Sequence, residues 1–215
     1  MCYNSAQMER TELGYWVALG RVPQIGRARF SLLEAHFENM EEAWKARPAA
    51  LEAAGLTGAP LSALLAARDG ITPEAELEKL DRKGIRALTW HDDAYPRRLK
   101  EIYDRPPILY ILGQLTAADE WSLAVVGTRR ATVYGRQAVE ELAGQLAGNG
   151  ITVVSGLARG IDAIGHQAAL AAGGRTIAVL ACGLDLIYPP AHLRLAPEIK
   201  ERGALVSDYP LGTQP

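Results

Sequence analysis

The stretch Ile151-Thr-Val-Val-Ser-Gly-Leu-Ala-Arg-Gly-Ile-Asp162 decides the fold class of this chain. Its apolar beginning, residues 151–154, predicts a strand, and a helical pattern follows directly after the glycine turn. At such a junction the helix presents unpaired N–H groups and the positive end of its dipole, which favour an anion. Arg159 adds a positive charge to the same turn. The stretch therefore predicts a phosphate-binding turn in an α/β domain.

A second junction of the same kind lies upstream. An apolar run at 123–126 predicts a strand that ends at Gly127, with Arg129 in the turn before the next helix. Ligands of open parallel sheets bind where the carboxyl ends of the strands meet, so we expect the two turns to face one ligand. The predicted phosphate-binding residues are Gly127, Thr128, Arg129, Ser155, Gly156, Arg159 and Gly160.

The second part of the chain alternates between strands and helices. Strands are expected at 85–90, 108–112, 123–126, 151–154, 176–181 and 204–207, and helices at 134–147, 161–172 and 191–202. The strands after residue 115 are continuous apolar runs, which is typical of a parallel sheet covered by helices on both faces. We therefore predict a Rossmann-like, mostly parallel α/β domain over 84–215. Its last strand is expected to be central or nearly so, which predicts that the domain is incomplete on its C-terminal side.

Residues 1–83 show helical spacing of apolar side chains and no strand period. They predict a small all-helical domain. Within it, Val22-Pro-Gln-Ile-Gly-Arg27 has the form of a helix-hairpin-helix turn, whose backbone N–H groups can meet a DNA phosphate. An ordinary structural turn between packed helices explains it better, because Pro and Gly commonly separate helices.

Net charge, cysteine content and the absence of long apolar runs narrow the classes of protein to which this chain can belong. The 215 residues carry a formal net charge of −2, so a nucleic-acid site must be a local basic patch. Cys2 and Cys182 are far apart, which predicts no disulfide framework and fits a reducing compartment. Because we find neither a run of about 18 apolar residues nor a signal sequence, we expect a soluble cytoplasmic protein with no membrane partner.

Signatures of cofactor binding and catalysis are missing from both turns. Neither has the G-x-G-x-x-G pattern, and no Gly-Lys-Ser/Thr triplet occurs, so we expect no nucleotide cofactor and no P-loop. Ser155 has no nucleophile elbow and is interpreted as a phosphate donor. Asp162 is expected to cap the following helix, and His166 to be a packed histidine rather than a base or metal ligand. Tyr188 offers a stacking face for a base or is buried under its loop; both readings stay open.

Every basic residue from 129 to 175 is an arginine, the side chain best suited to bidentate phosphate contact. Arg129 and Arg159 each stand beside a glycine turn at a strand end, and we expect them to contact phosphate. Arg130, Arg136 and Arg175 are interpreted as solvated charges.

These motifs together resemble the DNA-processing protein A (DprA/Smf) family over about half the chain. The resemblance rests on Val126-Gly-Thr-Arg129, Tyr134-Gly135, Ser155-Gly-Leu-Ala-Arg-Gly-Ile-Asp162, His166, Ala169-Leu170, Gly174-Arg-Thr-Ile-Ala-Val179, Gly183-Leu-Asp185 and Tyr188-Pro189. The N-terminal helices also resemble that family's SAM-like (sterile alpha motif) domain, less distinctively.

The resemblance implies a bacterial cytoplasmic protein that binds single-stranded DNA, protects incoming strands during natural transformation and loads the RecA recombinase. It implies a homodimer of the complete protein, no metal or cofactor, and no enzymatic activity. Family members continue beyond the position of Pro215 with an F-P-x-R-N-R-x-I segment. The alternative is an enzyme similar to the lysine-decarboxylase-like nucleotide phosphoribohydrolases. Their P-G-G-x-G-T-x-x-E string is absent, however, and Ala181-Cys-Gly-Leu-Asp-Leu186 stands at the comparable strand end.

Overall fold

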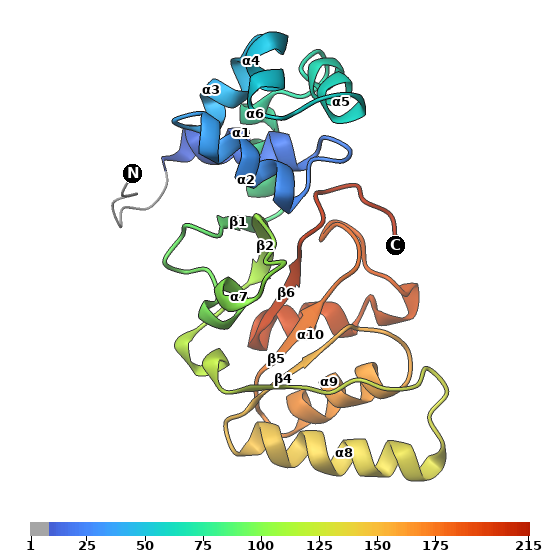
Figure 1. The fold of residues 1–215 in the computed structure, drawn as a ribbon. Coiled ribbons are helices and arrows are strands. Elements are labelled where there is room, and N and C mark those ends of the chain that lie inside the picture. Colours follow the sequence, from blue (N-terminus) through green and yellow to red (C-terminus); the bar gives the residue numbers. More distant parts are fainter. Residues whose placement is uncertain (1–8) are drawn as a thin grey trace. The chain divides into compact units, whose positions relative to one another are not determined.

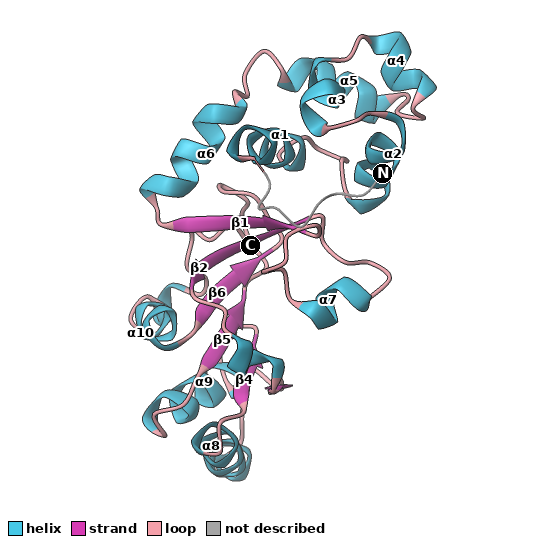
Figure 2. Cartoon of the chain, turned by 90° about the vertical axis from the view of Figure 1, so that its left-hand side faces the viewer, coloured by secondary structure: helices cyan, strands magenta, loops and turns pink. Residues whose placement is uncertain are grey.

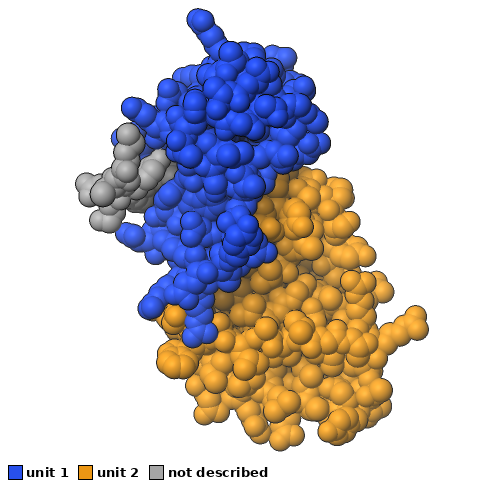
Figure 3. All heavy atoms as spheres, in the orientation of Figure 1, with its two compact units in different colours: residues 1–109 blue, residues 110–215 orange. Residues whose placement is uncertain are grey.

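The computed structural model describes residues 9–215 of the chain, so Cys2 lies outside the described residues. The chain divides into two compact units, 1–109 and 110–215 (Figure 3). The sequence places the domain boundary after residue 83 instead. The difference arises because β1 (Ile85–Thr89) contacts α1 and α6 of the helical part.

The first unit is mainly helical. Its elements are α1 (Arg10–Gly20), α2 (Arg27–His36), α3 (Met40–Lys45), α4 (Pro48–Ala53), α5 (Ala59–Ala67), α6 (Pro73–Arg82), β1 and α7 (Arg97–Glu101). Trp16 is fully buried, its ring stacks on Phe30 with centroids 5.2 Å apart, and Trp90 meets it edge-on at 5.8 Å. Large buried aromatic rings of this kind dominate the packing of a small helical core.

The sheet has the strand order β1-β2-β6-β5-β4-β3 (Figures 1 and 2). Its members after β1 are β2 (Ile108–Gly113), β3 (Ser122–Ala124), β4 (Thr152–Ser155), β5 (Thr176–Val179) and β6 (Ala204–Ser207). The pairs β3–β4, β4–β5 and β5–β6 are parallel, whereas β2 runs antiparallel to β6. The predicted Rossmann-like, mostly parallel sheet is thus confirmed.

Three helices of the second unit connect the parallel strands: α8 (Val133–Gly148), α9 (Ile161–Ala171) and α10 (Leu195–Arg202). Helix α9 contacts both α8 and α10. Because successive parallel strands are neighbours, right-handed crossovers place these three helices on the same face of the sheet. A buried cluster joins α8 and α9 to β4; it consists of Ala143, Ala147, Val153 and Ala169, small residues that let the helices approach the strand closely.

Two short 3₁₀ helices, η1 (Ala117–Glu120) and η2 (Pro190–His192), complete the second unit. The predicted helix at 191–202 therefore begins later, at Leu195, after the proline-rich turn. None of the helices within residues 9–215 is long and apolar enough to cross a membrane.

Candidate phosphate-binding site

Two turns at the carboxyl ends of β3 and β4 pack directly against each other. We call residues 125–132 the first turn and residues 156–160 the second turn. The Ile161 N–H donates to the Thr128 carbonyl oxygen at 3.2 Å. A Cβ on Gly160 would lie 2.8 Å from the Arg129 Cα, and one on Gly127 would lie 2.7 Å from the Ile161 Cγ1. Glycine at both positions is therefore required for the contact that joins the turns.

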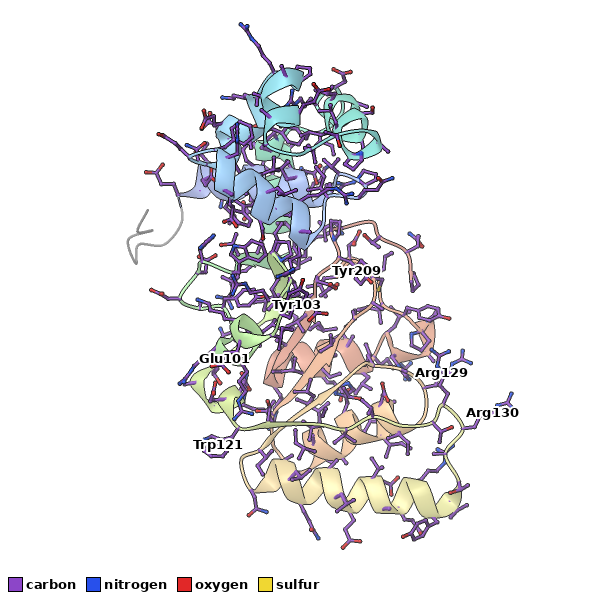
Figure 4. The ribbon with its side chains drawn as sticks, viewed as in Figure 1. Glu101, Tyr103, Trp121, Arg129, Arg130 and Tyr209 are labelled. Atoms are coloured by element: carbon purple, nitrogen blue, oxygen red, sulfur yellow. The ribbon has the colours of Figure 1, made fainter. Side chains whose placement is uncertain are left out.

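Arg129 and Arg159 are exposed, one in each turn. Neither guanidinium forms a hydrogen bond or an ion pair with any residue in the described part of the chain. Figure 4 shows Arg129 and Arg130 projecting from the first turn. Each arginine keeps all five N–H donors for an outside acceptor, and the joined turns bring two such groups to one edge of the sheet.

Ser155 does not point outward as a phosphate donor. Its side chain is 3% exposed, and its hydroxyl donates to the Val125 carbonyl oxygen at 2.6 Å. The hydroxyl has one proton, which is used to hold the end of β4 against the start of the first turn. Ser155 therefore positions the two turns, and the interpretation of it as a direct contact is corrected.

Asp162 has its carboxylate in the second turn, where the sequence predicts that a phosphate ligand binds the backbone N–H groups. It lies in the first turn of α9, where Gly160 is the N-cap residue, so it does not cap that helix. Its buried carboxylate Oδ2 accepts the N–H groups of Gly156 at 3.1 Å and Ala158 at 3.3 Å. An internal anion thus fills the second turn, and the Gly156 N–H is not free for a phosphate. The outward-facing groups of the site are Thr128, Arg129 and Arg159.

Buried hydrogen bonds beneath the turns fix α9 and the loop after β5. The Thr176 hydroxyl donates to the Val153 carbonyl at 2.7 Å, so its oxygen accepts from His166 Nδ1 at 2.7 Å. Burial lowers the His166 pKa to about 4 and keeps the imidazole neutral at pH 7. The expectation of a packed, hydrogen-bonded histidine is confirmed. His192 Nδ1 bonds the Leu157 carbonyl at 2.8 Å and links η2 to the second turn.

The other singled-out residues have different surroundings. Arg175 is not a solvated charge: its Nε and one terminal nitrogen each lie 2.9 Å from a different carboxylate oxygen of Asp119. Burial raises the Asp119 pKa, but the Arg175 hydrogen bond and further donors bring it below its usual value. Tyr188 is 53% exposed, which favours the reading as an available ring face. Cys182 is buried, and burial raises the pKa of its thiol.

The fold and the site define a Rossmann-like protein whose candidate phosphate site consists of two arginine-bearing turns instead of a dinucleotide fingerprint. Residues 86–215 match the family model of DNA recombination-mediator protein A, and the chain belongs to that family. Protein Smf from Synechocystis sp. is 40% identical over 97% of this chain and 54% of its own length. DNA processing protein DprA from Bacillus subtilis is 40% identical over 62% of this chain and 45% of its own. The chain spans about half the length of these curated relatives.

Solved structures give the same assignment. The X-ray structure of DNA processing protein A from Streptococcus pneumoniae superposes with a TM-score of 0.74 at 31% identity, covering 98% of this chain and 71% of that one. A structure of DNA processing protein A from Helicobacter pylori, which concerns that protein's single-stranded DNA binding mode, matches with a TM-score of 0.54 at 34% identity. It covers 61% of this chain and 58% of that chain. The resemblance seen in the motifs is therefore confirmed at the level of the family.

Proposed function

We propose that this chain binds single-stranded DNA through its backbone phosphates, as part of a recombination mediator. The observation that carries the proposal is the pair of exposed arginines, Arg129 and Arg159, held on two turns that a hydrogen bond joins. A guanidinium binds a phosphate by two parallel N–H···O bonds whatever the base, so this contact is independent of sequence. The Helicobacter pylori relative, which binds single-stranded DNA, supports the choice of ligand.

The remaining groups of the site position these arginines. Asp162 fixes the second turn through two backbone N–H groups, and Ser155 ties the end of β4 to the first turn. Thr128 accepts from the Arg130 N–H at 3.1 Å and still has a hydroxyl proton to donate. The turns therefore need little reorganisation when a strand arrives, which lowers the entropic cost of binding.

Beyond this contact, we propose that the protein acts by binding and not by catalysing a reaction, and that it protects incoming DNA and loads RecA onto it. We also propose that the complete protein is a cytoplasmic homodimer. Membership of the family of DNA recombination-mediator protein A supports the general role of a recombination mediator. The phosphoribohydrolase alternative predicts release of free base from a nucleoside monophosphate, and observing that release would contradict the binding role.

The test is the affinity of the chain for a labelled oligodeoxythymidine over a range of salt concentrations. Arg129→Ala and Arg159→Ala are each expected to weaken binding on the order of 10-fold, because a charged hydrogen bond is lost. The double variant should reduce the salt slope by about 1.4, at about 0.7 per phosphate contact on a single strand. Arg202→Ala is the matched control: this exposed arginine ends α10, just before β6 begins, at the opposite end of the strands. Unchanged affinity and salt slope in the double variant would refute the proposal.

A further inference from the structure

The first unit has an aromatic–arginine cluster that the two turns do not include. Tyr103, in the segment after α7, is 85% exposed (labelled in Figure 4). The Arg27 guanidinium lies 4.3 Å from the centroid of its ring, in cation–π geometry. This contact brings the start of α2 beside residues 102–107. One side of the phenol ring is thus held by an arginine while most of the ring stays open to solvent.

The basic residues around this ring are fixed by contacts within the same unit. The Arg105 guanidinium lies 5.2 Å from the Trp90 ring centroid and donates to the Lys100 carbonyl oxygen at 3.1 Å. Residues 97–107 contain two carboxylates, Glu101 and Asp104. Glu101 pairs with Arg97 at 3.5 Å, so Asp104 is the acidic side chain that remains to oppose the arginines. Positive charge therefore predominates beside Tyr103.

Arg27 also begins a helix whose N-terminus is open. Gly26 is the N-cap residue and supplies no side-chain cap, and nothing in the described part of the chain lies within 4 Å of where its Cβ would be. The preceding turn is anchored by the buried Val22 and Ile25, and the Ile25 N–H donates to the Val22 carbonyl at 3.1 Å. The buried side chains of the Val-Pro-Gln-Ile-Gly turn therefore pack between the helices, as expected for the structural turn that the sequence favours. The Arg29 and Phe30 N–H groups donate to the Gly26 carbonyl oxygen at 2.9 and 3.1 Å, so the N–H groups of Arg27 and Ala28 are the ones at the open end of α2.

From this juxtaposition we propose a second single-stranded nucleic-acid contact on the first unit. One base stacks on the open face of Tyr103, and the adjoining phosphate binds the Arg27 guanidinium and the N–H groups of Arg27 and Ala28. Every base has a π-face, so the contact is independent of sequence. It selects single strands, because the faces of bases in a duplex are already stacked on each other. The inference deepens the proposed function and rests on single-stranded DNA being the ligand.

The test measures labelled oligodeoxythymidine binding by the full chain with Tyr103→Ala, Tyr103→Phe and Arg27→Ala. Tyr103→Ala is expected to weaken binding on the order of 10-fold with an unchanged salt slope, because stacking carries no charge. Tyr103→Phe keeps the ring and should bind like the unchanged chain. Arg27→Ala should lower both the affinity and the salt slope. Trp121→Ala, at another exposed aromatic residue, is the control and should have no effect.

Direct contact is read by photocrosslinking an oligonucleotide that contains 5-iododeoxyuridine, which should label the peptide with Tyr103. Tyr103→Ala binding as tightly as the unchanged chain, with no crosslink at that peptide, would overturn the inference. If only the Arg129 and Arg159 substitutions weaken binding, the proposed turns stand and this second contact fails. If only the Tyr103 substitution weakens binding, the contact at Tyr103 stands and the proposed role of the two turns fails. An unchanged chain that binds no oligonucleotide refutes both, and a thermal melt of each variant shows that it is folded.

Discussion

Replacing Gly160 with alanine should separate the two turns of the phosphate site. Gly160 has φ +83°, a left-handed conformation that costs a residue with a Cβ about 1–3 kcal/mol. The new Cβ would also lie 2.8 Å from the Arg129 Cα and closer still to the Thr128 carbonyl oxygen. Relieving that overlap costs about 1–3 kcal/mol more. We therefore expect Gly160→Ala to lower the free energy of unfolding by roughly 2–6 kcal/mol in total.

Urea unfolding gives that free energy, and oligodeoxythymidine affinity measured on the folded variant reports the displaced Arg129. Gly150→Ala is the matched control: Gly150 has φ +81°, and no described residue lies within 4 Å of where its Cβ would be. It should lose only the backbone part, about 1–3 kcal/mol, and bind DNA normally. Equal destabilisation by the two substitutions, with DNA affinity preserved in both, would refute the reasoning about turn packing.

Three further outcomes can be checked by unfolding measurements. Asp162→Asn should destabilise by about 1–3 kcal/mol in urea, because the N–H groups of Gly156 and Ala158 lose a charged acceptor. His166 should make stability fall as the pH drops from 6.5 to about 4: the unfolded chain binds the proton first, and 2.5 pKa units correspond to about 3 kcal/mol. A His166→Gln variant should lack that slope in its melting temperature. Arg175→Ala should lower the melting temperature because it leaves the partly buried Asp119 carboxylate unpaired, whereas the exposed Arg136→Ala should not.

The sequence predicts the parallel strands and the two turns because their signals are local. Each strand is an apolar run that ends at a glycine or a polar turn, and the helix period begins after it. The antiparallel pairing of β2 with β6 has no such local signal, because about ninety residues separate the strands in the chain and only packing decides the pairing. The same limit applies to Arg175 and Asp119, which lie 56 residues apart.

Within the candidate site, residue type alone does not predict whether a polar group faces a ligand or an internal partner. A serine and a glycine at a strand end have the composition of a phosphate cradle, yet the Ser155 hydroxyl and the Gly156 N–H both have internal partners. The signal available in the sequence was the acidic Asp162 so close after the turn: a carboxylate there competes with any ligand anion for the same N–H groups. The arginines differ because a guanidinium that finds no internal acceptor must extend into solvent.

The carboxylate of Asp162 also affects which anions can compete for this site. Since the recess of the second turn already contains a negative charge, a small anion such as inorganic phosphate or a mononucleotide has no enclosed place to bind there. Arg129 and Arg159 are exposed in the two turns, so they remain available to the phosphates of a strand. If the proposed function holds, the turn would favour a strand of DNA over free nucleotides, because only the two arginines outside the recess bind its phosphates.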